Sequence, residues 1–117
     1  MEMETEEAMK KKPGTNRNNV RVLDLSGGLT VSTVDNLKKE VSKAAKGNDE
    51  EIVLNFEAVD RVDSSGLGAI ISCYVTLHRN KKRLSLVNLN EKIREVFFYT
   101  HLSKIINIYE GLEEVAA

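Results

Sequence analysis

The sequence predicts an α/β domain with a mainly parallel or mixed β-sheet flanked by helices. Two observations support this fold class: apolar runs of strand length alternate with amphipathic stretches of helix length, and the connections between them are short. The chain has 117 residues, of which 41% are hydrophobic and 30% charged, as is usual for a globular protein. One small domain with a real hydrophobic core is therefore expected.

The first 19 residues, MEMETEEAMKKKPGTNRNN, are rich in charge and offer few apolar side chains to bury. We expect residues 1–19 to be disordered or loosely attached and residues 20–117 to form the domain. A short edge strand around Met9 to Lys12 is a further expectation.

The domain opens with a strand and an amphipathic helix. The run VRVLDLSGG predicts a strand that ends at Gly27-Gly28. In TVSTVDNLKKEVSKAAKG, apolar residues recur every three or four positions, which is typical of one helix face. Thr30 or Ser32 is the expected cap and Gly47 the expected stop. The predicted apolar face consists of Val31, Val34, Leu37, Val41, Ala44 and Ala45.

The middle of the chain holds a central strand and a second helix. EIVLNF, from Glu51 to Phe56, is almost continuously apolar, which suits a strand covered on both faces. A helix is expected from Ser64 to Arg79, with Cys73 on its flank. Its predicted apolar side consists of Leu67, Ile70, Ile71, Tyr74, Leu77 and His78.

Three more elements complete the domain. RLSLVNL (83–89) predicts a strand, EKIREVFFYTHL (91–102) a helix, and KIINIY (104–109) a last strand. EGLEEVAA forms at most a short closing helix. The predicted apolar face of the 91–102 helix consists of Ile93, Val96, Phe97 and Thr100.

Composition argues against several functions. The net charge of −1 gives no general attraction to nucleic acid or to anionic membranes. Cys73 is the only cysteine, so it forms no internal disulfide and cannot build a zinc site. No apolar run approaches the roughly 20 residues that span a membrane, and the start lacks a signal-peptide core. We expect a soluble cytoplasmic protein without metal or cofactor.

The stretch VDRVDSSGLGAI places two serines where a strand turns into a helix. A nucleophile elbow needs Gly-x-Ser-x-Gly, but Val62 and Asp63 stand two residues before Ser64 and Ser65. His78 lies about 20 Å along the same helix from Ser64, at 1.5 Å rise per residue. Catalytic serine chemistry is therefore not expected.

The same turn also lacks a nucleotide cradle. Gly66-Leu67-Gly68 is only a Gly-x-Gly, because Ile71 stands where a dinucleotide fingerprint has its third glycine. A glycine inside a helix costs roughly 1 kcal/mol relative to alanine. The two glycines therefore suggest that a neighbouring strand or a partner protein approaches the first turn closely.

Two readings of the serines remain open on pattern alone. Asp63 or Ser64 suits a helix cap, worth about 1 kcal/mol. An exposed serine at a helix start also suits phosphorylation, which adds about −1.5 to −2 charge. That charge would fall beside Asp60 and Asp63, with Arg61 nearby as compensation.

The block IVLNFEAVDRVDSSGLGAIIS resembles the signature of STAS domains, and most closely that of bacterial anti-sigma factor antagonists. VRVLDLSGGLTVSTVDNLKKEV and RLSLVNLNEKIREVFFYTHLSKIINIY resemble flanking parts of the same family, so the likeness covers Val20 to Tyr109. The resemblance implies a single STAS domain over residues 20–117, with a small mixed sheet flanked by helices.

The resemblance also implies a non-enzymatic, phosphorylation-controlled binding switch in transcriptional regulation. The unphosphorylated antagonist captures an ATP-dependent serine kinase that is also the anti-sigma factor, and thereby frees the sigma factor. Phosphorylation of the serine after the aspartate, here Ser64, releases the antagonist. The chain is expected to be a monomer or weak homodimer. The residues expected to meet the kinase are Asp60, Asp63, Ser64, Ser65, Gly66, Leu67 and Gly68.

One departure from the family motivates an alternative. Related antagonists often read Gly-Glu-Leu-Asp after the first strand, where this chain reads Gly27-Gly28-Leu29-Thr30 and lacks both acids. STAS domains also serve as non-phosphorylated subunits of transport or signalling complexes. The alternative function is such an interaction subunit.

Overall fold

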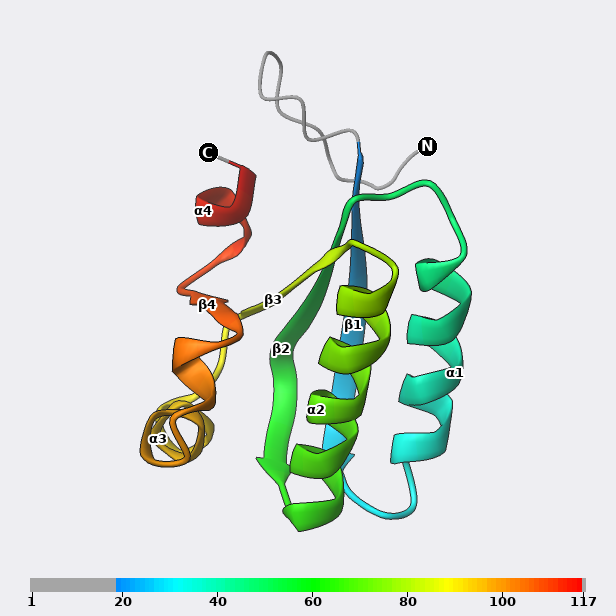
Figure 1. Cartoon of the computed structure of the whole chain (residues 1–117). Helices are drawn as coiled ribbons and strands as arrows, with labels where there is room; N and C mark the ends of the chain where they lie inside the picture. Colours follow the sequence, from blue (N-terminus) through cyan, green and yellow to red (C-terminus); the bar gives the residue numbers. More distant parts are fainter. Residues whose placement is uncertain (1–18, 117) are drawn as a thin grey trace.

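The computed structural model describes residues 19–116, with side chains through Val115. The expected strand around Met9 to Lys12 and the expectation for residues 1–18 fall outside this part of the chain. Within it, strands and helices alternate (Figure 1). The strands are β1 (Val20–Leu29), β2 (Glu51–Val62), β3 (Arg83–Val87) and β4 (Asn107–Tyr109). The helices are α1 (Val34–Ala45), α2 (Ser64–Arg79), α3 (Glu91–Tyr99) and α4 (Leu112–Ala116), with a 3-10 turn, η2 (Leu102–Lys104), before β4.

The described strands form one sheet in the order β1-β2-β3-β4, and all three pairings are parallel. The α/β prediction is confirmed. β2 is an internal strand buried on both faces, as its apolar run predicted. Ile52 and Leu54 face the larger hydrophobic cluster, whereas Val53 belongs to a smaller one on the other face.

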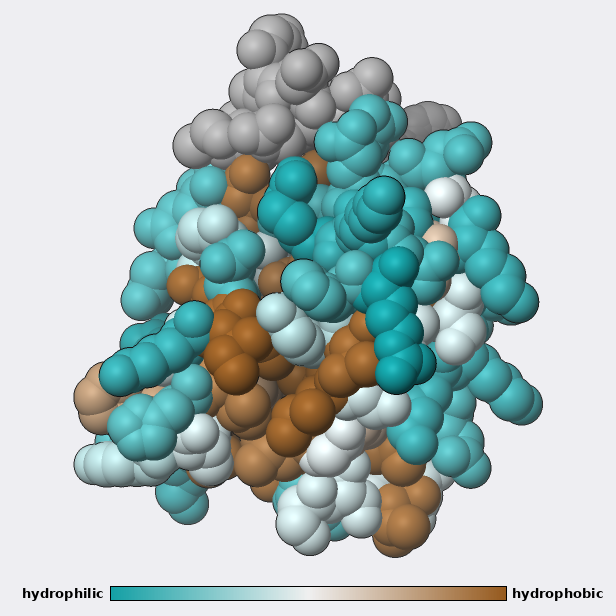
Figure 2. Space-filling model, viewed as in Figure 1, coloured by the Kyte–Doolittle hydropathy of each residue, from teal (hydrophilic) through white to brown (hydrophobic). Residues whose placement is uncertain are grey.

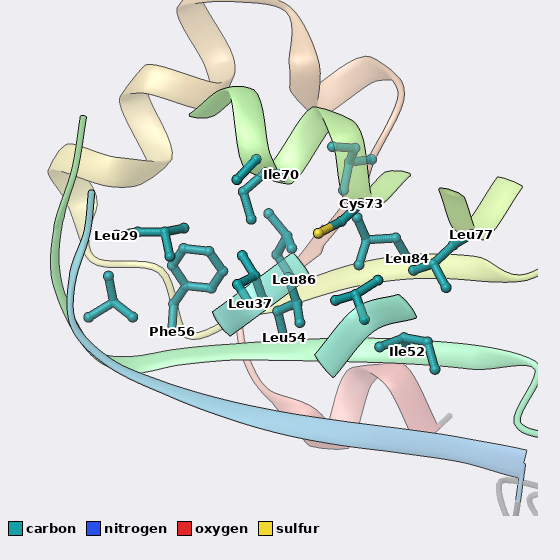
Figure 3. Close-up of a cluster of buried hydrophobic side chains, with 14 of the residues drawn as sticks. Leu29, Leu37, Ile52, Leu54, Phe56, Ile70, Cys73, Leu77, Leu84 and Leu86 are labelled. Carbon is teal, nitrogen blue, oxygen red and sulfur yellow. The ribbon is translucent and has the colours of Figure 1, made fainter. Parts of the chain in front are cut away.

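The larger cluster lies between the sheet and helices α1 and α2, and Ile93 and Phe97 of α3 also belong to it. α1 and α2 run side by side across one face of the sheet (Figure 1). Figure 3 shows Leu37 from α1 and Ile70 from α2 in one cluster with Leu54 and Leu86 from the sheet. Burying such a side chain contributes roughly 1.5–3 kcal/mol. The smaller cluster consists of Val53, Val87 and Val115, with Val20, Val22 and Tyr109 packed against it.

β1 and β2 are longer than the sequence predicted. β1 passes through the glycine pair to Leu29, and β2 continues past Phe56 to Val62. The pairing between them shifts register on either side of Gly27, whose φ is +77°. Such a bulge lets pairing continue where the alternation of apolar residues has already ended.

The start of α1 differs from the prediction. The helix begins at Val34, so neither Thr30 nor Ser32 is its cap. The Thr30 N–H donates to the Thr33 hydroxyl at 3.0 Å, which closes a separate turn before the helix. Val31, predicted to lie on the buried face, belongs to this turn and is 71% exposed.

α2 spans the predicted residues, but its buried face is rotated relative to the prediction. Cys73, expected on the flank, is only 2% exposed, and Ile71, expected to be packed, is 41% exposed. Both α1 and the sheet pack on α2, so its buried face is set by two neighbours. On α3, Phe97 is buried as predicted, but Val96 and Thr100 are exposed. The buried residues of α2 are Gly66, Ala69, Ile70, Cys73 and Leu77.

The last elements are shorter than predicted because left-handed residues interrupt them. Asn88, with φ of 62°, follows the end of β3 at Val87. His101, with φ of 64°, follows the end of α3 and leads into η2. β4 therefore begins only at Asn107 rather than Lys104.

Cys73 should resist thiol reagents while the protein is folded. Burial raises the pKa of its thiol from 9.0 to about 11, and the charge of Lys38 opposes this shift. Thiolate is the reactive form, so at about pH 8 we expect Ellman's reagent to react about 100-fold more slowly than in urea-unfolded protein. Equal rates would contradict the burial. Because the folded pKa exceeds the unfolded one, the free energy of unfolding should also fall between pH 9.0 and about 11.

Candidate functional site

The serine turn joins the end of β2 to the start of α2. Asp63 is extended, with φ of −96° and ψ of −173°, and helical geometry begins at Ser64. The Asp63 carboxylate accepts a hydrogen bond from the Gly66 N–H at 2.9 Å. Asp63 is therefore the helix cap, and the Ser64 hydroxyl is left out of capping.

The first turn of α2 lies directly against the end of β1. The Asp63 N–H donates to the Leu29 carbonyl at 3.2 Å. A Cβ atom on Gly66 would lie 2.2 Å from the same carbonyl oxygen, which is far inside van der Waals contact. Gly66 is thus required by a neighbouring strand, whereas a Cβ on Gly68 would meet no atom within 4 Å.

The predicted site residues divide by exposure. Gly66 is buried, and Ser65 and Leu67 are half-buried. The remaining four are exposed: Asp60 near the end of β2, and Asp63, Ser64 and Gly68 around the start of α2. Of the predicted partner-binding residues, these four are the exposed ones.

Ser64 begins an exposed stripe along the outer side of α2. Gly68, Ile71 and Val75 follow it at intervals of four, three and four residues, which places all of them on one helix face. Ile71 and Val75 are 41% and 39% exposed. Figure 2 shows hydrophobic surface over the middle of the molecule, where Figure 1 places α2. The stripe offers an apolar contact surface that leads up to the serine.

The turn between β1 and α1 borders this site, because it follows Leu29 directly. The Thr30 hydroxyl accepts from the Ser32 N–H at 3.3 Å, and the Thr33 hydroxyl donates to the Gly28 carbonyl at 2.9 Å. Hydroxyl groups thus organise the segment in which the resemblance leads one to expect acids. Val31 extends from this turn into solvent.

Arg61 supplies the basic group of the site. Its guanidinium contacts the Asp60 carboxylate at 3.4 Å, and both side chains are 68% exposed. An ion pair this exposed is worth about 0–1 kcal/mol.

Neither histidine is placed to act as a general base for Ser64 or Ser65. His78 is exposed and stacks on Tyr74 with ring centroids 5.6 Å apart, and His101 lies in the turn after α3. Among residues 19–116, no hydrogen bond joins either imidazole to Ser64 or Ser65. The same residues contain no group of three His, Cys, Asp or Glu side chains that could hold a metal. None of their helices is long and apolar enough to cross a membrane.

The model of the STAS domain matches residues 11–115. The chain belongs to the STAS domain family. This confirms the family that the Asp-Ser-Ser-Gly-Leu-Gly block indicated. The match covers both the serine turn and the elements that position it.

Known proteins similar to this STAS domain include antagonists of anti-sigma factors. The anti-sigma-B factor antagonist of Staphylococcus aureus is 29% identical over 89 residues, which cover 76% of this chain and 82% of that protein. The anti-sigma factor antagonist SpoIIAA in its unphosphorylated form has a TM-score of 0.65 at 27% identity, covering 84% of this chain and 86% of that one. The Bacillus cell fate determinant SpoIIAA in the phosphorylated form has a TM-score of 0.66 at 28% identity, covering 84% and 87%.

Two apolar residues near the serine turn are exposed, although the sequence predicts them to be buried. Val31 and Ile71 both fit a helical repeat of apolar residues, which is why the pattern places them on buried faces. Ile71 and Val75 also lie seven and eleven residues after Ser64. That spacing was the available signal for a stripe aligned with the serine.

Exchanging the two glycines for alanine should have opposite effects on stability. Gly66→Ala forces a methyl group against the Leu29 carbonyl, so we expect a loss of about 2–4 kcal/mol, the range of severe packing and backbone clashes. Gly68→Ala has open space and gains helix propensity, so stability should rise by up to about 1 kcal/mol. Urea unfolding of both variants measures this. Equal midpoints would show that β1 does not hold the turn closely.

Proposed function

We propose that this STAS domain is an anti-sigma factor antagonist whose binding is switched by phosphorylation of Ser64. In this role the unphosphorylated chain captures an ATP-binding serine kinase that acts as the anti-sigma factor, and a sigma factor is freed. The chain itself has no catalytic part and works in the cytoplasm. One observation carries the proposal. Ser64 is the first residue of α2, and its exposed hydroxyl takes no part in capping the helix, because Asp63 already does so.

The turn is suited to accept a phosphate without rearranging. Asp63 already caps the helix, so Ser64 makes no hydrogen bond that modification would break. The first amides of a helix lack intrahelical partners and lie at the positive end of its dipole, which favours a nearby anion. The relatives support the same reading, since one of them has been solved in a phosphorylated form.

The phosphate would nevertheless change the surface that a partner meets. It adds about −1.5 to −2 charge, next to the exposed carboxylates of Asp60 and Asp63. Like charges about 4 Å apart repel by roughly 1 kcal/mol in water and about 4 kcal/mol at an effective dielectric of 20. Each 1.4 kcal/mol is a tenfold loss of affinity. A docked kinase would therefore be released.

A second candidate function is that of a STAS subunit that is never phosphorylated. It is favoured by one observation: Gly28 and Thr30 stand where the family resemblance leads one to expect acids, and Thr30 takes part in a hydroxyl-bonded turn instead. The first experiment below separates the two candidates.

Phosphorylation is tested with an ATP-binding kinase encoded beside this chain. Incubation with kinase and ATP should add one phosphate to the intact mass of the parent chain and of Ser65→Ala, and none to Ser64→Ala. A phosphate that persists in Ser64→Ala would refute the site. An unmodified parent chain that still binds the kinase would favour the second candidate.

The outer stripe of α2 should carry part of the binding energy. Val75→Asp places a charge in the apolar surface that leads up to Ser64, so we expect affinity for the kinase to fall about tenfold or more. Val96→Asp on α3 is the matched control, since Val96 is 36% exposed and Val75 is 39% exposed. Isothermal titration calorimetry measures both. Equal losses would place the kinase elsewhere.

A further inference from the structure

Arg61 lies flat against Gly28 on the neighbouring strand. The two residues are paired in the β1–β2 register. A Cβ atom on Gly28 would lie 2.9 Å from the guanidinium carbon of Arg61 and 3.1 Å from two of its nitrogens. Three atoms at nearly equal distances mean that the plane of the group covers the glycine. The guanidinium therefore occupies the space that a side chain at position 28 would fill, and we call this space the seat of the guanidinium.

This seat adjoins the serine turn. Gly28 immediately precedes Leu29, whose carbonyl accepts the Asp63 N–H at 3.2 Å. Along β2, Arg61 stands three residues before Ser64, so their Cα atoms are at most about 11 Å apart. Both an arginine and a phosphoserine extend well beyond their Cα atoms, and both side chains here face solvent. A Cα separation of this size allows the guanidinium and a phosphate on Ser64 to meet when the two side chains turn toward each other.

The guanidinium is available for such a contact. It forms an ion pair with the Asp60 carboxylate at 3.4 Å, and both side chains of this pair are 68% exposed. The carboxylate of Asp63 is engaged by the Gly66 N–H, and the adjoining turn of residues 30–33 carries no charged side chain. A phosphate offers three acceptor oxygens and more charge than a carboxylate, and it matches the fork of an arginine. It would compete successfully with Asp60.

We propose that Arg61, seated on Gly28, is the built-in counter-ion of a phosphate on Ser64. This inference rests on the proposed function, because it concerns the modified form of that site. Arg61 offsets part of the charge that the phosphate adds beside Asp60 and Asp63. It thereby determines how much negative charge a partner meets after phosphorylation. An acid at position 28 would pair with the guanidinium and keep it from a phosphate. Glycine at position 28 therefore leaves Arg61 available to pair with a phosphate on Ser64.

The test uses the full chain with phosphoserine installed at position 64 during translation, and phosphorus NMR to follow the phosphate through its second ionisation. A nearby cation favours the dianion, so Arg61 lowers this pKa. In Arg61→Gln we expect the pKa to rise by about half a unit, the scale that an exposed ion pair supplies. Arg61→Lys keeps the charge without the fork and should give an intermediate value.

Arg79→Gln is the matched control. It removes the same charge from the other end of α2, about 22 Å away at 1.5 Å per residue, well beyond the Debye length at physiological salt. Its phosphate pKa should equal that of the parent. An unchanged pKa in Arg61→Gln, or an equal rise in Arg79→Gln, would overturn the inference. Since translation installs the phosphate, this result does not depend on whether any kinase modifies Ser64.

Discussion

The contact between the end of β1 and the first turn of α2 positions the candidate site. A strand carbonyl needs a hydrogen-bond partner, and the Leu29 carbonyl finds one in the Asp63 N–H. It can do so only because Gly66 has no side chain, since a Cβ there would lie 2.2 Å from the carbonyl oxygen. The contact ties the end of β2 and the start of α2 to β1. It leaves Ser64 on the outer side of the helix, where neither capping nor packing uses it.

Hydrophobic patterning located the four described strands and α1, α2 and α3, because each carries an apolar run or repeat, but it did not predict the 3-10 turn η2. It placed both ends of α2 correctly, since the serine turn and the following polar turn are strong local signals. It was wrong where contacts with a neighbouring element determine the end of a strand or the buried face of a helix. β2 continues past Phe56 because bulged pairing with β1 replaces the lost alternation. The buried face of α2 turns toward Cys73 because α1 packs on it, and Val31 fits the helical repeat although a hydroxyl-bonded turn holds it outside α1.

The candidate site was predictable as a segment, but the individual roles within it were not. The Asp-Ser-Ser-Gly-Leu-Gly block indicates the turn, the cap and the exposed serine. Nothing local distinguishes Gly66, which a strand requires, from Gly68, which faces open space. The relation of Arg61 to Gly28 arises from strand register, which brings together residues far apart in sequence. At the end of β1, this STAS domain has a glycine on which a guanidinium packs and, after it, a turn held by hydroxyl groups.

If Ser64 is phosphorylated as proposed, the serine turn should keep its backbone hydrogen bonds and change only its surface. Amide hydrogen exchange, measured by NMR on the chain with serine and with phosphoserine at position 64, tests this most directly. We expect the Asp63 and Gly66 amides, which donate to the Leu29 carbonyl and the Asp63 carboxylate, to be protected from exchange in both forms. Exchange at the rate of an open loop in either form would contradict it.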